Sequence, residues 1–214
     1  MTAWMCGLAL AAVPMLGGQA KLPLVPMAPI ALYSEFEQAP PAAVKAALDG
    51  ELESIMKPLG LRFEWRDLRG PRLEAPAVEL AVISFKGRCD VAGLVRRAAA
   101  GGPLGWTHIS DGSILPFSDV DCDGVRALLQ SDLLAIPAAA REAAFGRALA
   151  RVLAHELYHI FADTTRHGSF GIGKEAYTAR DLLAGNFRFE NRESKALRNG
   201  KAYGTLGKGL ALRE

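Results

Sequence analysis

A single segment, residues 138–162, constrains the fold of this chain more than any other part of its sequence. Its large apolar residues recur every three to four positions, which is the spacing of one face of an α-helix. They are Leu149, Leu153, Leu157 and Ile160. The pattern predicts a long amphipathic helix whose main apolar contact lies on that face.

Two histidines and a glutamate stand near the end of this segment, in the order His155-Glu156-Leu157-Tyr158-His159. On a helix, His155 and His159 lie about one turn apart on one side, so both imidazoles can reach the same Zn²⁺ ion. They fall roughly 80° to 160° from most of the apolar face, outside the main apolar contact. Glu156 lies about 100° round the helix, where its carboxylate can activate water. The motif therefore predicts a zinc site with Glu156 as the general base.

Two histidines do not complete a zinc site, so a third ligand is needed. Asp163 continues the row of His155 and His159. On an unbroken helix it lies about 12 Å along the axis from His155, which is too far to share a metal ion. We therefore expect its carboxylate to contact a histidine ligand rather than the metal. His167 follows two β-branched threonines and precedes Gly168, so the chain can leave the helix and curl back. His167 is the favoured third ligand.

The segment HELYHIFADTTRHG resembles the motif HExxHxxGxxH of the metzincin branch of the zincin metallopeptidases. The match is partial, because Ala162 stands at the family's glycine, Thr165 stands at its third histidine, and His167 follows two residues later. No methionine follows Met56, so the methionine turn of the family is absent. The methionine turn forms the floor of the site in that family, so residues Phe170 to Tyr177 would have to form it here.

This resemblance implies an α+β fold, in which a twisted, mostly parallel sheet with an antiparallel edge strand packs on the long helix. It also implies a zinc peptidase, most simply an endopeptidase, that acts on a peptide or protein. The segment Gly105–Ser110 is the nearest match to the edge strand that binds the substrate backbone, which makes Trp106, Thr107 and His108 candidate substrate-binding residues. A lone strand histidine is also typical of a polar surface. Tyr177 is a candidate for contacting the oxyanion, or a packing tyrosine.

The gluzincin branch of the zincins takes its third ligand from a glutamate on a later helix, and Glu175 is the candidate for that arrangement. Thr178 and Asp181 have the spacing of a capping box, so Glu175 would lie before the helix rather than within it. A solvated loop charge is the more ordinary interpretation of Glu175. The gluzincin pattern therefore fits less well than the metzincin pattern.

Two other functions are compatible with a zincin-like sequence. One is a catalytically inactive zincin fold that binds peptides or cell-wall components, and the intact Glu156 argues against it. The other is a purely structural zinc site. Such sites are usually closed by four protein ligands, often thiolates, and no cysteine lies near His155 in the sequence.

The N-terminal residues 1–20 resemble a secretory signal peptide. The apolar stretch Trp4 to Leu16 is too short to span a membrane comfortably, and small residues at Gly18 and Ala20 suit cleavage before Lys21. We therefore expect a secreted or periplasmic protein without stable membrane insertion after processing.

Removal of residues 1–20 would take Cys6 away and leave Cys89 and Cys122. An even number of cysteines in an exported chain suggests a disulfide, which would contribute roughly 3 to 4 kcal/mol by the loop-entropy model. Two buried thiols are the alternative.

The remaining pattern gives a mixed order of helices and strands. A proline-rich stretch covers residues 23–29. Helices are expected over Pro41–Met56 and Val125–Leu134, and strands over Leu61–Leu68, Glu79–Phe85, Gly105–Ser110 and Ser113–Phe117. The apolar face of the first helix consists of Val44, Leu48, Leu52 and Ile55.

Length and charge bound the organisation of the chain. Its 214 residues, 50% of them hydrophobic, suit one catalytic domain over residues 21–190. Residues 191–214 are rich in charge and glycine with little periodicity, which predicts a flexible C-terminal tail. A net charge of +2 provides no large basic field, so nothing points to nucleic acid.

Overall fold

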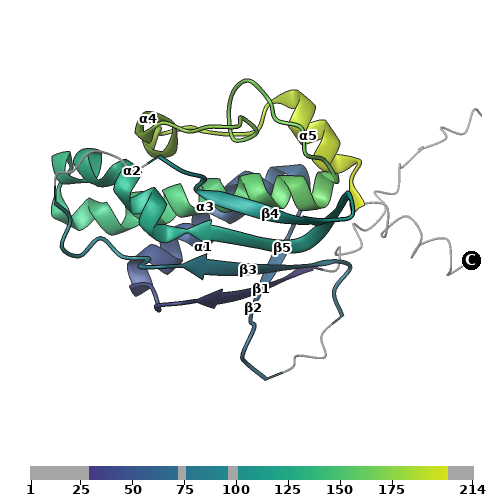
Figure 1. Cartoon of the computed structure of the whole chain (residues 1–214), viewed down its shortest axis with the longest axis horizontal. Coiled ribbons are helices and arrows are strands. Elements are labelled where there is room, and N and C mark those ends of the chain that lie inside the picture. Colours follow the sequence, from purple (N-terminus) through teal and green to yellow (C-terminus); the bar gives the residue numbers. More distant parts are fainter. Residues whose placement is uncertain (1–28, 72–75, 96–100, 202–214) are drawn as a thin grey trace, which may run out of the picture.

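The computed structural model describes residues 29–71, 76–95 and 101–201, which form a five-stranded sheet with helices packed against it (Figure 1). The strands are β1 (Ile30–Phe36), β2 (Phe63–Asp67), β3 (Leu80–Lys86), β4 (Gly105–Ser110) and β5 (Ser113–Asp121). They are ordered β2-β1-β3-β5-β4, and only β4 runs antiparallel to its neighbour in this described sheet. The predicted mostly parallel sheet with β4 as an antiparallel edge strand is confirmed.

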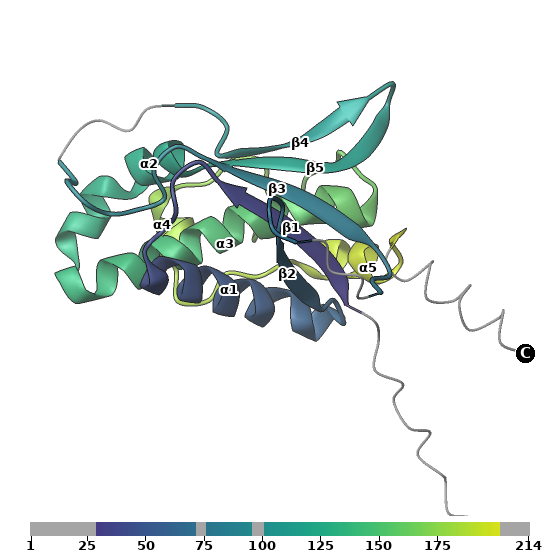
Figure 2. The same ribbon diagram turned by 90° about the horizontal axis from the view of Figure 1, so that it is seen from below.

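The helices lie mainly on one face of the sheet and beyond its β4 edge. They are α1 (Ala42–Met56), the short 3₁₀ helix η1 (Lys57–Leu59), α2 (Cys122–Ala135), α3 (Ala138–Ala162), α4 (Ala179–Leu183) and α5 (Asn191–Arg198). Helices α1 and α3 lie side by side against the sheet. Residues 163–201, which include α4 and α5 and are called the late segment below, pass beyond β4 (Figures 1 and 2). Edge strand, long helix and this late segment therefore meet at one edge of the molecule.

Helix α3 has the predicted bounds, and its apolar face is buried against α1 and the sheet. The apolar face predicted for α1 is buried as well. Gly146 allows the two helices to approach closely, because a Cβ atom there would lie 2.3 Å from the carbonyl oxygen of Val44. A larger residue at Gly146 would push α3, and the histidines on it, away from α1.

Strand β1 is absent from the sequence prediction. It lies between β2 and β3, and its first residues Ile30 to Leu32 are buried. An interior parallel strand is covered on both faces and does not show the alternation that marks a half-buried strand. Two other elements are longer than predicted, because β5 continues to Asp121, whose side chain then accepts from the Gly124 N–H at 2.9 Å and starts α2 at Cys122.

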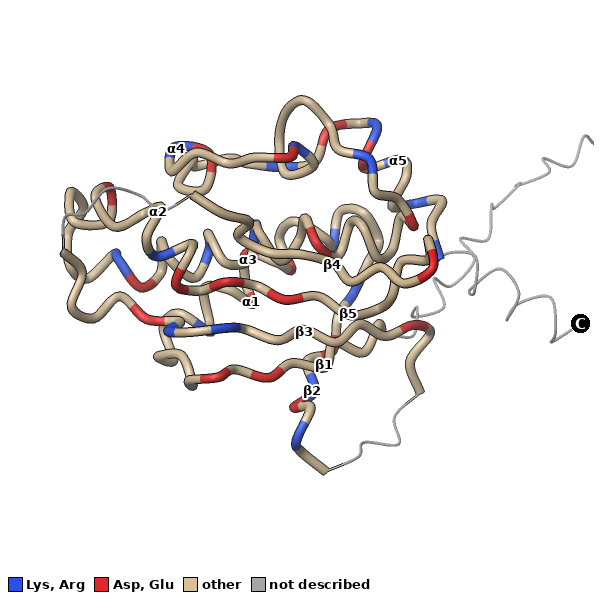
Figure 3. Tube along the Cα trace, in the orientation of Figure 1, with Lys and Arg blue, Asp and Glu red and all other residues tan. Residues whose placement is uncertain are grey.

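The prediction of a flexible tail from residue 191 is wrong for its first part. Residues Asn191–Arg198 form α5, in which Leu197 and Glu193 are 0% and 1% exposed. Basic and acidic residues are both frequent along this late segment (Figure 3). The single buried leucine of α5 therefore gives no apolar pattern in the sequence, and the burial of Glu193 cannot be predicted from its residue type. The expected signal peptide and residues 202–214 lie outside the described residues.

A buried arginine attaches the late segment to the core. Arg151 on α3 is 1% exposed and forms an ion pair with Glu51 of α1, with Nη2 2.9 Å from Oε1. Its Nη1 donates to the carbonyl oxygens of Asp181, Leu182 and Ala184 at the end of α4, at 3.3, 3.0 and 2.7 Å. One guanidinium group therefore joins α1, α3 and α4 one helical turn before His155.

Cys89 and Cys122 form a disulfide, with their Cα atoms 4.9 Å apart, so the predicted pairing is confirmed. Both residues are buried, at 1% and 0% exposure. The bond attaches the loop after β3 to the first residue of α2. Within the described ranges, no helix has the length and apolar character needed to cross a membrane.

We expect replacement of Cys89 and Cys122 by alanine to lower the free energy of unfolding by about 3 to 4 kcal/mol relative to the oxidised protein, because the cross-link closes a long loop in the unfolded chain. Urea denaturation measures this difference. Reduced wild type is the matched control and should unfold close to the double variant. Coincident unfolding curves for oxidised and reduced wild type would contradict the expectation.

Candidate metal centre

The last two turns of α3 hold His155 and His159 in a fixed orientation. His155 Nδ1 lies 2.8 Å from the carbonyl oxygen of Ile172, and His159 Nδ1 lies 2.7 Å from that of Thr164. A carbonyl oxygen only accepts hydrogen bonds, so each Nδ1 must carry the hydrogen and donate it. In the neutral imidazole, Nε2 is then left with its lone pair.

The two Nε2 atoms point at each other and lie 2.9 Å apart. Burial lowers the pKa of His155 to about 3 and also lowers the pKa of His159, so both rings are neutral near pH 7. Two lone pairs at this distance repel unless a cation lies between or beside them. Ligand nitrogens on tetrahedral zinc lie about 3.3 Å apart, given bonds of about 2.0 Å. The donor set therefore fits a zinc ion.

His167 comes back to these two rings after the helix ends. Asp163 closes α3 in the left-handed conformation with φ of 50°, and the chain then turns back through the threonines. The His167 ring lies 5.1 Å from the His155 ring and 4.9 Å from the His159 ring, measured between centroids. One ligand atom from each histidine lies within 4.8 Å of the others. The structure therefore assembles the three histidines that the sequence favoured, as a group able to hold a metal ion.

The other two candidate ligands lie elsewhere. The expectation that Asp163 contacts a histidine ligand is wrong, because it forms an exposed ion pair with Lys201 at 2.8 Å. Backbone carbonyl oxygens, not a carboxylate, accept from the Nδ1 atoms of the two helix histidines. Glu175 is exposed on the rim of the cavity in front of the histidines. Thr178 and Asp181 form the predicted capping box of α4, so Glu175 precedes this helix as expected.

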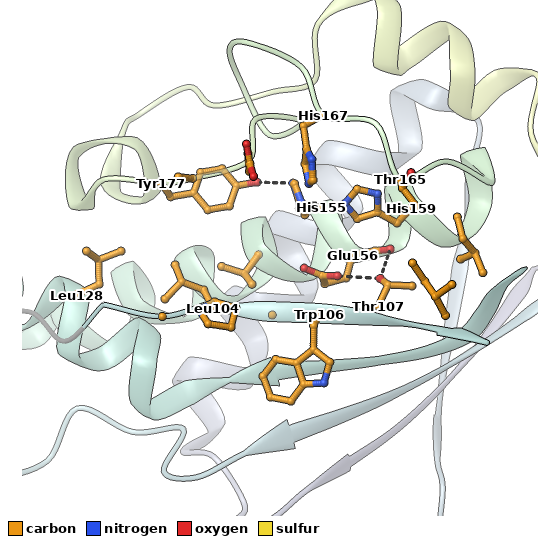
Figure 4. Close-up of a pocket in the computed structure, with 18 of the residues that line it drawn as sticks. Leu104, Trp106, Thr107, Leu128, His155, Glu156, His159, Thr165, His167 and Tyr177 are labelled. Carbon is orange, nitrogen blue, oxygen red and sulfur yellow. Dashed lines mark hydrogen bonds between the residues drawn. The ribbon is translucent and has the colours of Figure 1, made fainter. Parts of the chain in front are cut away.

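Glu156 lies in the same cavity and is 4% exposed. Burial raises the pKa of its carboxyl group to about 7, although a hydrogen bond from Thr107 acts in the opposite direction. Thr107 Oγ1 donates to Glu156 Oε2 at 2.7 Å and is itself 2.8 Å from Ser118 Oγ (Figure 4). Gly105 makes room for the carboxylate, since a Cβ atom there would lie 2.9 Å from Glu156 Oε1. The edge strand therefore holds one oxygen of the glutamate.

Alternation along β4 separates the predicted substrate-binding residues. Thr107 points towards Glu156, whereas Trp106 points away from the histidines (Figure 4). The His108 ring pairs with Asp119 at 2.5 Å, and His108 is not among the residues that line the cavity. Trp106 and His108 therefore offer their backbone, rather than their rings, on the side of the site.

The cavity has a volume of about 570 Å³ and extends along β4. One end is apolar and the centre is polar, where Glu156 and the three histidines lie. The apolar side chains at that end include Leu104 and Leu128 (Figure 4). A cavity with an apolar end and a few convergent polar groups is the usual form of a small-ligand or peptide site.

Three site features were not found from the sequence. The carbonyl groups of Ile172 and Thr164, which orient the histidines, leave no signal because every residue type has a carbonyl. The contact of Thr107 with Glu156 depends on how β4 crosses α3. The predicted replacement floor, residues 170–177, supplies the buried Ile172 and the partly buried Tyr177, whereas Phe170 is 68% exposed.

Comparison with known proteins supplies no argument about what this chain does. No family model matches the chain, and no curated protein matches it. Among solved structures, it is similar to a zinc-dependent peptidase from Methanocorpusculum labreanum (strain Z), at 14% identity and a TM-score of 0.48. That similarity covers 78% of this chain and 99% of the other. Any function for this chain has to be argued from the site itself.

We expect Glu156→Gln to stabilise the metal-free protein at high pH. The folded protein keeps the Glu156 proton up to about pH 7, whereas the unfolded chain releases it near 4.5. A raised folded pKa favours folding fully below about pH 4.5, and this contribution is lost as the pH rises to about 7. Above pH 7, the variant should therefore exceed wild type in unfolding free energy by about 3 kcal/mol, relative to their difference at pH 4.

Urea denaturation in the presence of a chelator, at pH values from 4 to 8, measures this difference. Glu175→Gln is the matched control, because it removes an exposed carboxylate on the rim of the same cavity. A difference between Glu156→Gln and wild type that does not change with pH would show that Glu156 titrates alike in both states.

Proposed function

We propose that this chain is a zinc-dependent peptidase, with His155, His159 and His167 as the metal ligands and Glu156 as the general base. The observation that carries the proposal is the convergence of two neutral Nε2 atoms, 2.9 Å apart, in one cavity with a buried carboxyl group. A structural zinc site would not need an adjacent buried carboxyl group with a pKa of about 7.

When bound, zinc would polarise the scissile carbonyl and make water more acidic. The residues of the chain have separate parts in the proposed reaction. The three histidines hold the metal, and the carbonyl groups of Ile172 and Thr164 keep Nε2 of His155 and His159 free for it. Imidazole binds a metal ion in its neutral form, so three histidine ligands would leave the positive charge of the ion available to favour attack on a carbonyl.

Glu156 is proposed to take a proton from the attacking water and pass it to the leaving amine. Its Oε2 atom already accepts from Thr107, which leaves Oε1 to receive the proton. A pKa of about 7 suits this role, because the group can both accept and return a proton near neutral pH. Ser118 supports Thr107 from the neighbouring strand β5.

The proposed substrate is an extended peptide. Strand β4 is an edge of the sheet, and its free side offers main-chain groups along the cavity. A peptide that pairs antiparallel with β4 would pass Glu156 at the level of Thr107. Main-chain pairing recognises backbone rather than a particular sequence, so unfolded proteins are suitable first substrates.

We also propose that the protein works outside the cytoplasm. The buried Cys89–Cys122 disulfide supports this location, because such bonds persist in oxidising compartments. The signal-like sequence of residues 1–20 points the same way.

We expect His167→Ala to weaken zinc binding strongly, whereas Glu175→Ala should change it little. His167 is one of the three histidines whose ligand atoms converge, and Glu175 lies on the cavity rim. Zinc affinity measured by competition with a chromogenic chelator separates the two variants. The opposite order of affinities would assign the third ligand to Glu175 and the site to the gluzincin arrangement.

The experiment that tests the proposed activity is the cleavage of mixed peptide libraries or an unfolded protein by the zinc-loaded chain. Glu156→Gln keeps the shape of the side chain but removes its basicity, so cleavage should fall about 10²-fold or more while zinc content is retained. Mass spectrometry of the products and metal analysis measure both quantities. If wild type and variant leave every substrate uncut, the chain would instead be an inactive peptide- or cell-wall-binding zincin fold.

A further inference from the structure

Tyr177 lines the cavity, and its hydroxyl lies on the Nδ1 side of the His155 ring. Its hydroxyl oxygen is 3.0 Å from His155 Nδ1, and its O–H donates to the carbonyl oxygen of Ile172. The same carbonyl accepts from His155 Nδ1 at 2.8 Å. The hydrogen on Nδ1 therefore faces two acceptors, and the tyrosine is bonded to one of them.

This position does not suit contact with a reacting carbonyl. A group that stabilises the oxyanion has to lie on the Nε2 side of the histidines, where the metal and substrate would be bound. The hydroxyl of Tyr177 lies on the Nδ1 side and is already engaged with His155 and Ile172 (Figure 4). The role in oxyanion binding that the sequence suggested for Tyr177 is therefore not favoured by the geometry.

We propose that Tyr177 is a positioning residue that fixes the orientation and tautomer of His155, acting directly on Nδ1 and through the carbonyl group of Ile172. The inference rests on the proposed metal site. Groups that hold the far nitrogen of a histidine ligand set its ring angle and its basicity, and their loss typically weakens metal binding about 10- to 100-fold.

The surrounding structure keeps the Tyr177 hydroxyl in place. The ring of Tyr177 packs edge-on against the rings of His155 and Phe187, at 5.7 and 5.8 Å between centroids. The next residue, Thr178, begins α4 with the capping box, and Asp181 of that box pairs with Lys174 at 2.6 Å. The backbone on both sides of Tyr177 is therefore held by polar contacts.

Arg151 completes this support from the core. It donates to three carbonyl groups at the end of α4, and its guanidinium lies 5.7 Å from the centroid of the Phe187 ring that Tyr177 contacts. Helix α3 therefore carries both His155 and the residue that anchors the segment behind it. The support is specific to His155, because His159 Nδ1 is held by the Thr164 carbonyl instead.

Tyr177→Phe tests the proposal, because it removes one hydroxyl group and keeps the ring. We expect the dissociation constant for zinc to rise about 10-fold or more. We also expect the visible absorption spectrum of the cobalt-substituted protein to change, since it reports the arrangement of the ligands. At limiting zinc the variant should lose cleavage, and added zinc should restore most of it.

Tyr33→Phe is the matched control. Tyr33 lies on β1, and its hydroxyl oxygen accepts from Arg66 at 3.3 Å, remote in the chain from the histidines. This variant should bind zinc and cobalt as wild type does. The melting temperature of the metal-free Tyr177→Phe protein should stay close to that of wild type, which separates a local effect on the site from a loss of folding.

Two results would overturn the proposal. Unchanged zinc affinity and an unchanged cobalt spectrum in Tyr177→Phe would show that the hydroxyl does not orient His155. Unchanged affinity with a fall in kcat at saturating zinc would assign Tyr177 to the reaction itself. Failure of the proposed function is distinguishable, because a wild type that binds zinc without cleaving peptides loses the peptidase assignment while the affinity comparison still decides the role of Tyr177.

Discussion

The hydrogen bonds from the Nδ1 atoms of His155 and His159 to backbone carbonyls determine what the rest of the site can do. These bonds fix both tautomers, so two lone pairs converge 2.9 Å apart in a buried position. The accepting carbonyls belong to Ile172 and Thr164, outside the helix that carries the histidines. A metal site of this kind therefore exists only while the late segment stays folded against α3, which links metal affinity to the local stability of that segment.

The carboxyl group of Glu156, the proposed general base, depends on the opposite side of the cavity. Glu156 is held by Thr107 of the edge strand, and Gly105 leaves room for it. A buried carboxyl group without such a donor would be costlier to ionise, so β4 also affects how readily Glu156 loses its proton. Helix, edge strand and late segment each contribute one indispensable part, and none of them forms the site alone.

The sequence predicts the parts of this site that depend on residue type and spacing. The apolar period of α3 and the His155–His159 spacing require a helix with two convergent imidazoles, and the helix-weakening threonines before His167 allow the chain to return. Partners supplied by the backbone cannot be predicted in this way, because a carbonyl group has no residue identity. Strand β1 lacks the alternation of a half-buried strand, and α5 has too few apolar residues to show a helical period. Neither element can therefore be predicted from the sequence pattern, because both are stabilised by tertiary contacts.

Polar anchors add to the apolar contacts of the late segment, which buries Ile172, Leu182, Phe187 and Leu197. Arg151 supplies one buried guanidinium with an ion pair to Glu51 and three carbonyl acceptors. Removing either partner of such a buried pair typically costs about 3 to 5 kcal/mol, because the remaining charge is left uncompensated. Arg151 lies one turn before His155, so α3 carries both this histidine and the residue that anchors the end of α4. Helix α3 therefore links the position of His155 to the packing of the late segment against it.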